Sequence, residues 1–534
     1  MWGQLYEQTA NMISFILRRD RIRLPIWIIS LTAITVITAS AFPGLYSSDQ
    51  ERQAIAETMK NPAMTAMVGP GYGLDDYTEG AMMAHQMLLF TAIAVAIMSI
   101  LIVTRHTRTD EEEGRVELIR SLPVGRLANV MAAMVVLLGT NILLAVIIGF
   151  SLFSLGIESI DLQGSLLYGA ALGGTGIFFA AVTALFAQLS ESSRGTIGYS
   201  FALLGVAYLV RAIGAVSSEA LSWFSPLGWI LRTEVYVNNR WWPLLLTVGI
   251  AFIIGGVALY LNRRRDLGAG ILPSKPGKKN ASPLLQSPFG LALRLQRTSI
   301  IAWAVGMFIL GASYGSIFGD LESFLANNEM MRQAFEPIEG LTLTEQFLTM
   351  LMSIISMICT IPPIMFVLKL KGEEKRNRTE HLLARAVSRM HVMGSYFVLS
   401  VLFGFLMLLL ALTGLWLAAS SVMEEPISLG TLYQAGLAYL PAMWMMIGLA
   451  MLLIGLIPQM TGITWLYLGY SFFVVYLGGL LQFPEWLGQL SPFGHIPQLP
   501  VEDLNILSVS VLTGLAAILA AIGFIGYRKR DLAG

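Results

Sequence analysis

The sequence predicts an all-α protein that crosses a membrane many times. Of its 534 residues, 55% are hydrophobic and only 13% are charged, about half the charged fraction of a soluble domain. The apolar residues fall in blocks of about 20, the length that a helix needs to cross the hydrocarbon core. Lipid offers no partners to backbone groups, and the blocks are too continuously apolar for barrel strands. The fold class is therefore an all-α polytopic membrane protein.

The spans are predicted to form two parallel six-helix repeats, twelve in all. They lie near 24–43, 83–104, 129–155, 164–189, 196–216, 242–261, 298–318, 347–369, 391–419, 431–457, 463–481 and 504–526. Each half ends in a similar basic motif, Arg263-Arg264-Arg265-Asp266-Leu267-Gly268 and Arg528-Lys529-Arg530-Asp531-Leu532-Ala533. We expect a first half at 1–270, a flexible Pro- and Gly-containing linker at 271–287, and a second half at 288–534.

Basic residues predict the orientation. With the N-terminus inside, 28 of the 34 basic residues fall in cytoplasmic segments. The other six are Arg52, Lys60, Arg211, Arg232, Arg240 and Arg332. By the positive-inside rule, both termini are expected to be cytoplasmic and the chain to sit in a lipid bilayer. The formal net charge of zero does not indicate a nucleic-acid partner.

Shorter elements are predicted at both membrane faces. Residues 2–17 place apolar side chains at roughly helical spacing, and Ser287-Pro288 would cap a second such segment. We expect interfacial helices there, with a plain juxtamembrane tail as the alternative. On the outer side, Ser48-Asp49 can cap a helix through about Lys60, and residues 322–335 are compatible with another. These outer segments are too short to form a catalytic domain.

The most informative segments are 110–126 and 373–389, which follow the second span of each half. They match at a constant offset of 263 in seven of seventeen positions: Asp110 with Glu373, Glu111 with Glu374, Arg115 with Arg378, Glu117 with Glu380, Ile119 with Leu382, Val124 with Val387 and Arg126 with Arg389. We expect a short surface helix whose acidic start opposes the helix dipole. Val116, Ile119 and Leu122 would form an apolar stripe that docks on a soluble partner. A charged loop that only fixes topology is the alternative.

The run Glu112-Glu113-Gly114-Arg115-Val116-Glu117-Leu118-Ile119-Arg120-Ser121-Leu122-Pro123-Val124-Gly125-Arg126 resembles the segment after the second span in ABC transporter permeases of the polyketide-antibiotic (multidrug) exporter family. In architecture the resemblance covers nearly the whole chain, and its specific motif covers about fifteen residues. It implies a coupling helix that contacts a nucleotide-binding subunit. The implied contact residues are Glu111, Arg115, Glu117, Arg120 and Arg126, with Glu374, Arg378, Glu380 and Arg389 in the second copy.

The second copy departs from this pattern. His381, Arg385 and Ala386 stand where Leu118, Leu122 and Pro123 stand in the first copy. We therefore expect the two contacts with an ATPase to be unequal.

The resemblance implies export of amphipathic drugs or antibiotics across the plasma (inner) membrane of a bacterium. No Gly-x-x-x-x-Gly-Lys-Ser/Thr phosphate loop occurs in the sequence. The chain is therefore not expected to be an enzyme or to bind a cofactor; ATP and Mg would be bound by a separate ABC ATPase subunit in two copies. Lipid, cell-wall precursor or peptide translocation by the same complex remains an alternative. A self-sufficient secondary carrier is another, although no span carries an acidic pair at mid-depth.

Few residues stand out as candidates for a substrate pathway. Arg211, near the outer end of the fifth span, would either line an outward vestibule or snorkel to the headgroups. Met443 and Met446 in the tenth span offer flexible thioethers to apolar ligands, with ordinary packing as the alternative. His85, at the outer end of the second span, is expected to be solvated. The Asp, Glu, His and Lys residues form no cluster in the sequence that predicts a metal site or a lipid-modifying active site.

Overall fold

The computed structural model describes residues 2–46, 48–272, 279–320, 343–423, 427–477, 484–497, 499 and 505–531. Within these ranges the secondary structure is helical, without strands. Eleven of the described helices are long and apolar enough to cross a membrane. The predicted all-α polytopic class is confirmed. The predicted span that is not among them, 463–481, is the eleventh in order and ends outside the described residues, so the count of twelve stays a prediction.

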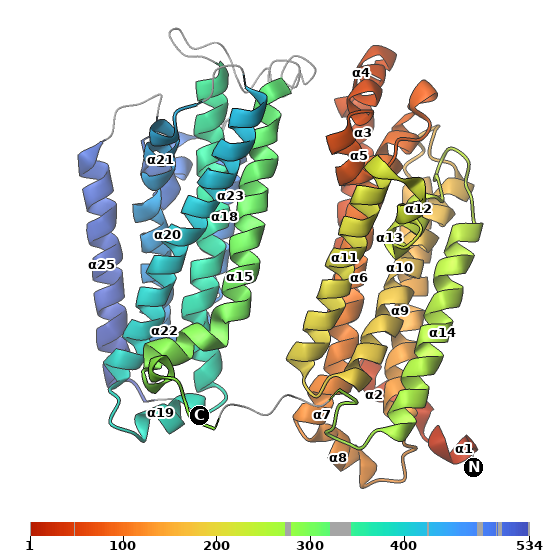
Figure 1. Ribbon diagram of the computed structural model, residues 1–534, viewed down its shortest axis with the longest axis horizontal. Helices are drawn as coiled ribbons and strands as arrows, with labels where there is room; N and C mark the ends of the chain where they lie inside the picture. Colours follow the sequence, from red (N-terminus) through yellow and green to blue (C-terminus); the bar gives the residue numbers. More distant parts are fainter. Residues whose placement is uncertain are drawn as a thin grey trace. The chain divides into compact units, whose positions relative to one another are not determined.

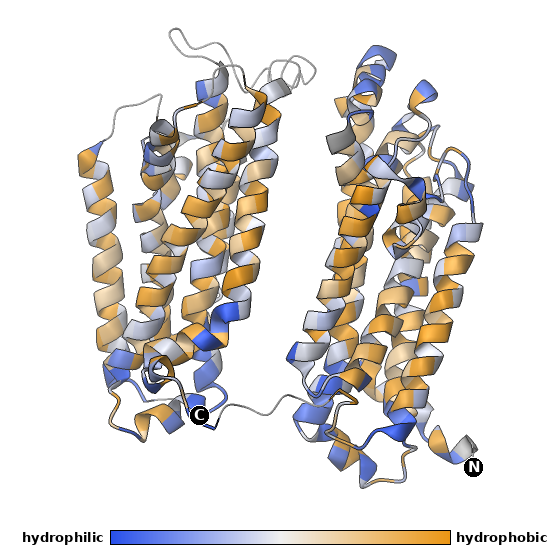
Figure 2. Ribbon diagram, in the orientation of Figure 1, coloured by the Kyte–Doolittle hydropathy of each residue, from blue (hydrophilic) through white to orange (hydrophobic). Residues whose placement is uncertain are grey.

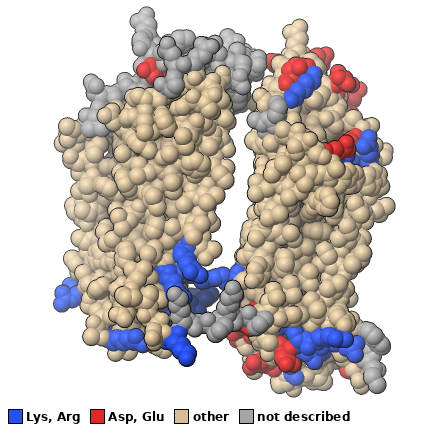
Figure 3. Space-filling view, viewed as in Figure 1, with Lys and Arg blue, Asp and Glu red and all other residues tan. Residues whose placement is uncertain are grey.

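The chain divides into two compact units, Met1–Gly277 and Lys278–Gly534. Each is a bundle of helices (Figure 1). The division falls within residues 271–287, the segment predicted as a linker. Figure 2 shows that the long helices are apolar along most of their length. In Figure 3 charged side chains gather near both ends of the first unit and toward the lower end of the second, as expected when the middle of a bundle faces lipid.

The described part of the first unit is built on six long helices: α3 (Arg23–Leu45), α6 (Glu79–Thr104), α9 (Ala128–Phe153), α10 (Leu162–Leu189), α11 (Ser193–Ser217) and α14 (Trp242–Arg264). Helix α10 is the central one, since it packs against α6, α9, α11 and α14. Small residues allow this close packing. A Cβ on Gly169 would lie 2.1 Å from the carbonyl oxygen of Ala145 on α9.

Short elements close both ends of the first unit. They are α1 (Trp2–Leu5), α2 (Thr9–Arg19), α4 (Asp49–Met59), α5 (Pro62–Val68), η1 (Leu74–Asp76), the π-turn η2 (Arg105–Thr109), α7 (Asp110–Glu112), α8 (Arg115–Arg120), α12 (Glu219–Ser222) and α13 (Pro226–Leu231). The helix predicted after Ser48 is confirmed as α4. Its capping box is complete, because the Glu51 N–H donates to Ser48 Oγ and the Ser48 N–H donates to Glu51 Oε2.

The described part of the second unit has seven longer helices: α15 (Pro288–Gly315), α18 (Leu343–Glu374), α20 (Arg389–Val422), α21 (Leu429–Leu437), α22 (Leu440–Leu456), α23 (Ile463–Leu477) and α25 (Ile506–Lys529). The shorter elements are η3 (Pro283–Gln286), η4 (Ser316–Asp320), α19 (Arg378–Leu383), η5 (Pro458–Met460), α24 (Glu485–Gln489) and η6 (Pro492–His495). The tenth predicted span, 431–457, is present as one candidate span, Leu429–Leu456. A turn divides it into two helices, since α21 ends before Pro441 enters the first turn of α22. The outer helix predicted at 322–335 lies outside the described residues.

The two amphipathic segments differ in structure. Residues 2–17 form α1 and α2, and three residues separate α2 from α3. In the second unit, Ser287 caps α15 as predicted, accepting a hydrogen bond from the Gly290 N–H at 3.0 Å. Its amphipathic turns then continue into the span without a break, as one helix, so their position at the membrane interface stays a prediction. Nothing in residues 288–300 interrupts the helical backbone, whereas Asp20 ends α2.

Candidate functional site

Both inter-span segments form the same local structure. Gly114, at φ +73°, precedes the six-residue helix α8, and Asn377, at φ +55°, precedes the six-residue helix α19. Glycine and asparagine are the residues that adopt this left-handed conformation most readily. The predicted short helix is therefore present in both halves, at the predicted offset of 263. We call the end of each unit that carries these helices its basic end.

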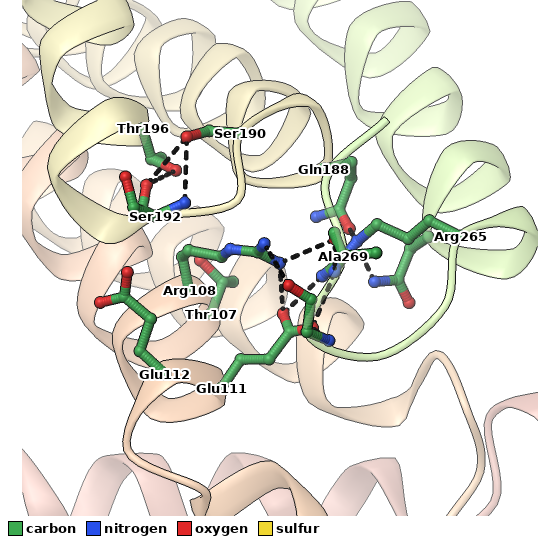
Figure 4. Close-up of polar contacts among 12 residues, drawn as sticks. Thr107, Arg108, Glu111, Glu112, Gln188, Ser190, Ser192, Thr196, Arg265 and Ala269 are labelled. Atoms are coloured by element: carbon green, nitrogen blue, oxygen red, sulfur yellow. Dashed lines mark hydrogen bonds and ion pairs between the residues drawn. The ribbon is translucent and has the colours of Figure 1, made fainter. Parts of the chain in front are cut away.

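Glu111 is bound into its own half. Its carboxylate accepts two hydrogen bonds from Arg265, at 2.7 and 2.5 Å, one from Arg108 at 3.0 Å and one from the Gly268 N–H at 2.6 Å. Figure 4 shows Arg108 and Arg265 approaching this carboxylate together. Arg265 also donates from Nη1 to the Ala269 carbonyl oxygen at 2.7 Å. A carboxylate held by two guanidinium groups and an amide is a strong, directional contact.

The second half repeats part of this arrangement. Arg530 Nη2 donates to Glu374 Oε2 at 2.5 Å. Arg126 donates to the carbonyl oxygen of Arg265 at 2.6 Å, and Arg389 donates to that of Arg530 at 2.7 Å. We call these two sets the terminal clasps: Glu111, Arg126 and Arg265 in the first half, and Glu374, Arg389 and Arg530 in the second. Each clasp joins the segment after the second span to the end of the last span.

A second ion pair stabilises the turn before each short helix. Asp110 accepts from Arg115 at 2.6 Å, and Glu373 accepts from Arg378 at 3.3 Å. Asp110 also accepts from Arg19 at 2.5 Å, which joins α2 to α7. That hydrogen bond raises the pKa of the Arg19 guanidinium, which keeps its charge.

The predicted apolar docking stripe is only partly correct. Val116 is 5% exposed and Ile119 packs against the core of the first unit, so both face inward. The apolar residues that face outward are Leu118, 72% exposed, and Leu122, 60% exposed. Leu118 lies on α8, and Leu122 lies two residues after its end. The even spacing of apolar residues in α8 did not reveal which of its faces packs on the bundle.

The nine coupling residues implied by the resemblance thus divide into three groups. Arg115, Glu117, Arg378 and Glu380 are exposed on the two short helices. Arg120 is half-buried beside Arg126, and burial followed by the charge of Arg126 lowers the pKa of its guanidinium. The four clasp residues Glu111, Arg126, Glu374 and Arg389 bond within the fold. The three positions at which the second copy departs from the pattern are exposed in both halves. They hold Leu118, Leu122 and Pro123 in the first copy and His381, Arg385 and Ala386 in the second.

Two polar candidates near the outer end of the first unit, Arg211 and His85, are buried rather than solvated. Arg211 is 0% exposed; its Nη2 donates to the Met67 carbonyl oxygen at 3.1 Å, and its guanidinium lies 4.6 Å from the ring centroid of Tyr208. It neither snorkels to headgroups nor pairs with a carboxylate among the described residues. His85 is also buried, 2.8 Å from the Tyr77 hydroxyl and 3.2 Å from the Gly69 carbonyl oxygen. Both side chains therefore contact backbone carbonyl groups at the C-terminal end of α5.

Met443 and Met446 lie inside the apolar core of the second unit, 1% and 0% exposed. Packing accounts for both side chains. Their place on a substrate pathway stays a prediction.

Sequence reasoning missed several residues of the basic end. Arg265 and Arg530 were visible as repeated motifs, but nothing linked them to Glu111 and Glu374, more than 150 positions away. Asp20, which is fully buried, is hydrogen-bonded to His106 of η2 and forms an ion pair with Arg105 at 3.4 Å. Among the described residues, the groups of His, Cys, Asp and Glu do not include one that could hold a metal ion.

Comparison with known proteins identifies the family. A family model described as "Multidrug efflux system permease Rv1217c, C-terminal domain" matches residues 10–263 and again 285–528, which are the two halves. The multidrug efflux system permease protein Rv1217c of Mycobacterium tuberculosis (strain ATCC 25618 / H37Rv) is 36% identical over 537 residues, covering 99% of this chain and 96% of that protein. This chain is therefore a multi-pass membrane transport component that belongs to the multidrug efflux system permease family.

Proposed function

We propose that this chain is the permease subunit of an ABC exporter, driven by ATP hydrolysis on a separate nucleotide-binding subunit. The observation that carries the proposal is the duplicated surface helix, α8 and α19, tied by a terminal clasp to the last span of its own half. A topology-fixing loop does not need such bonding. A helix that receives force from a partner does, because it must move with the bundle.

The clasp makes the connection rigid. Glu111 follows directly on α6 and η2, and Arg265 directly on α14. Both side chains are nearly buried, so their charge-assisted bonds are little weakened by water. A push on α8 would therefore act on the second and sixth spans of the half together.

The exposed residues would form the contact itself. In the first half these are Arg115, Glu117, Leu118 and Leu122, and in the second half Arg378, Glu380, His381 and Arg385. Glu111, Arg126, Glu374 and Arg389 would transmit movement rather than touch the partner. The sequence lacks a phosphate loop, so we assign ATP and Mg to two copies of an ABC ATPase subunit.

The family supports our assignment of the cargo and the location. We assign amphipathic drugs or antibiotics as substrates because the relative's name describes multidrug efflux. We place the chain in the plasma (inner) membrane of a bacterium, with the basic ends in the cytoplasm. The permease alone would have no enzymatic activity.

The test is co-purification with the ATPase. The chain, extracted from its native membrane in mild detergent, should bring down a soluble protein that contains a phosphate loop. The double variant Leu118→Glu and Leu122→Glu should reduce that recovery at least tenfold and abolish ATP-dependent drug efflux, because it places carboxylates on the exposed apolar face. Leu272→Glu, another exposed apolar residue near the basic end of the same unit, is the matched control and should change neither.

Undiminished recovery and efflux in the double variant would contradict the proposal. Efflux that survives ATP depletion but stops when the membrane gradient is collapsed would instead favour a self-sufficient secondary carrier. Efflux that stops on ATP depletion while the gradient is maintained supports the exporter.

A further inference from the structure

The second unit contains an apolar cavity of about 260 Å³ at its basic end. It lies between the first turns of α15, the short helix α19 and the start of α20. Its apolar wall includes Leu291, Leu295, Leu382 and Val392, and its polar rim includes Arg378 and His381. The first turns of α15 are the amphipathic segment expected at the membrane interface. The cavity therefore opens where lipid headgroups meet the hydrocarbon.

Residue differences between the two halves explain the cavity. When the two halves are aligned on Trp27 and Trp303, the offset is 276 positions. At this offset Leu295 of the second half corresponds to Arg19 of the first. In the first unit, Arg19 extends to Asp110 and donates a hydrogen bond at 2.5 Å. Leucine cannot make that bond. Glu373, the counterpart of Asp110, pairs with Arg378 at 3.3 Å and Lys369 at 3.6 Å instead, and the position beside it is apolar.

The charge around the cavity is positive. Residues 368–389 contain seven basic and three acidic residues, whereas the equivalent residues 105–126 contain five of each. Arg294 and Arg297 are exposed on the first turns of α15, and Arg378 is half-exposed beside the cavity. The one carboxylate lining the cavity, that of Glu373, is nearly buried and already paired. The site would attract an anion with an apolar chain and disfavour a cation.

We propose that this cavity binds an anionic phospholipid of the adjacent leaflet, with one acyl chain along Leu291, Leu295 and Val392 and the phosphate at Arg378 and His381. Clustered basic residues beside an interfacial helix are the usual setting for anionic headgroups. The apolar wall supplies affinity through burial of the chain. The first half, where Arg19 occupies the matching position, would lack the site. This inference goes beyond the proposed function and does not depend on it.

The test measures lipid retained by the purified full chain. Detergent-solubilised protein is incubated with phosphatidylglycerol or phosphatidylcholine, and the bound lipid is counted by native mass spectrometry. We expect one tightly retained phosphatidylglycerol and at least tenfold weaker retention of phosphatidylcholine. Leu295→Trp, which fills the cavity, should reduce phosphatidylglycerol retention at least tenfold. Ile301→Trp, exposed on the same helix but outside the cavity lining, should retain it as the wild type does.

A second variant separates the cavity from charge alone. Leu295→Arg reproduces the residue of the first half, so it fills the cavity while adding a positive charge. Loss of phosphatidylglycerol in this variant supports the proposal, and unchanged or increased retention overturns it. Leu291→Trp, on the same wall, replaces Leu295→Trp if that variant does not fold, as judged by gel filtration and helix content.

Two other outcomes also overturn the proposal. Equal retention of phosphatidylglycerol and phosphatidylcholine would mean that the site does not select charge. Binding of the cationic amphiphile tetraphenylphosphonium in place of phosphatidylglycerol, lost in Leu295→Trp, would assign the cavity to a transported cation.

Discussion

Helices α8 and α19 share part of their internal bonding, which we call the frame, but they expose different side chains. Both follow a left-handed residue, both carry an ion pair across that turn, and both are clasped to the last span of their half. The residues that differ are exposed: two leucines in the first copy and His381 and Arg385 in the second. The two copies thus share these internal hydrogen bonds and ion pairs but have different exposed side chains. Under the proposed function, the shared bonding transmits movement in both halves, whereas the two exposed faces make unequal contacts with the ATPase.

The largest expected effect comes from breaking the clasp. Arg265→Leu leaves the buried Glu111 carboxylate without its bidentate partner, which should cost about 3–5 kcal/mol of unfolding free energy. Arg530→Leu should cost less, since Glu374 accepts one guanidinium bond rather than two. Thermal unfolding in detergent measures both. Arg264→Leu, which removes a guanidinium that stacks on Tyr260, is the control. Equal losses in the two clasp variants would remove the predicted asymmetry.

A smaller effect is expected at the buried hydrogen bond between Asp20 and His106, whose residues are not repeated in the second half. Asp20 pairs with His106, whereas Gln296 and Lys369 occupy the matching positions in the second half. Asp20→Asn should destabilise the first unit by about 2 kcal/mol, because a buried charge-assisted hydrogen bond is lost. Faster amide hydrogen exchange in α2 is the measurement. Gln296→Asn is the matched change and should leave exchange in α15 nearly unaltered; comparable acceleration there would contradict the comparison.

Exchanging the outward faces tests the surfaces directly. Leu118→His with Leu122→Arg gives α8 the face of α19, and we expect about tenfold weaker ATPase binding, or about 1.4 kcal/mol. Binding of the purified ATPase to the reconstituted permease is the measurement. The reciprocal change, His381→Leu with Arg385→Leu, is added to the first variant. It leaves the internal bonding of both helices intact and should not restore the ATPase binding that the first variant lost. Wild-type affinity in the first variant would show that the two faces are interchangeable.

The smallest effect concerns the turn before each short helix. Gly114→Ala places a Cβ at φ +73°, which should cost about 1 kcal/mol. Asn377→Gly removes that same restriction in the second copy and should change stability by a few tenths of a kcal/mol at most. Thermal unfolding of the two variants side by side checks the sign. A larger loss for Asn377→Gly would mean that its side chain has a contact beyond the turn.

Much of the frame could be predicted from the sequence. Apolar block length indicated the spans, Ser48 and Ser287 indicated helix starts, and the offset of 263 paired the two surface helices. Each rests on neighbours within a few positions along the chain or on a direct repeat. The two terminal motifs were equally visible, but their partners Glu111 and Glu374 were not. Charged residues far apart along the chain can pair in many ways until packing selects one.

Which side chains are exposed was harder to predict from the sequence. Val116, Ile119 and Leu122 suggested a stripe from spacing, yet two of the three face the bundle. His85 was expected in water and lies buried against Tyr77. In a chain so rich in apolar residues, hydrophobicity does not distinguish a side chain facing a helix from one facing lipid or a partner.

The sequence by itself determined the membrane class, the duplication and the location of the surface helices, because hydrophobic length and internal repetition are properties of the chain alone. The tertiary structure decided which charges serve the fold and which are exposed. It turned Glu111 into a buried anchor, Arg211 into a clamp on α5, and Leu295 into the wall of a cavity. These roles depend on which helices pack together, since burial and pairing come from neighbours that the linear order does not specify.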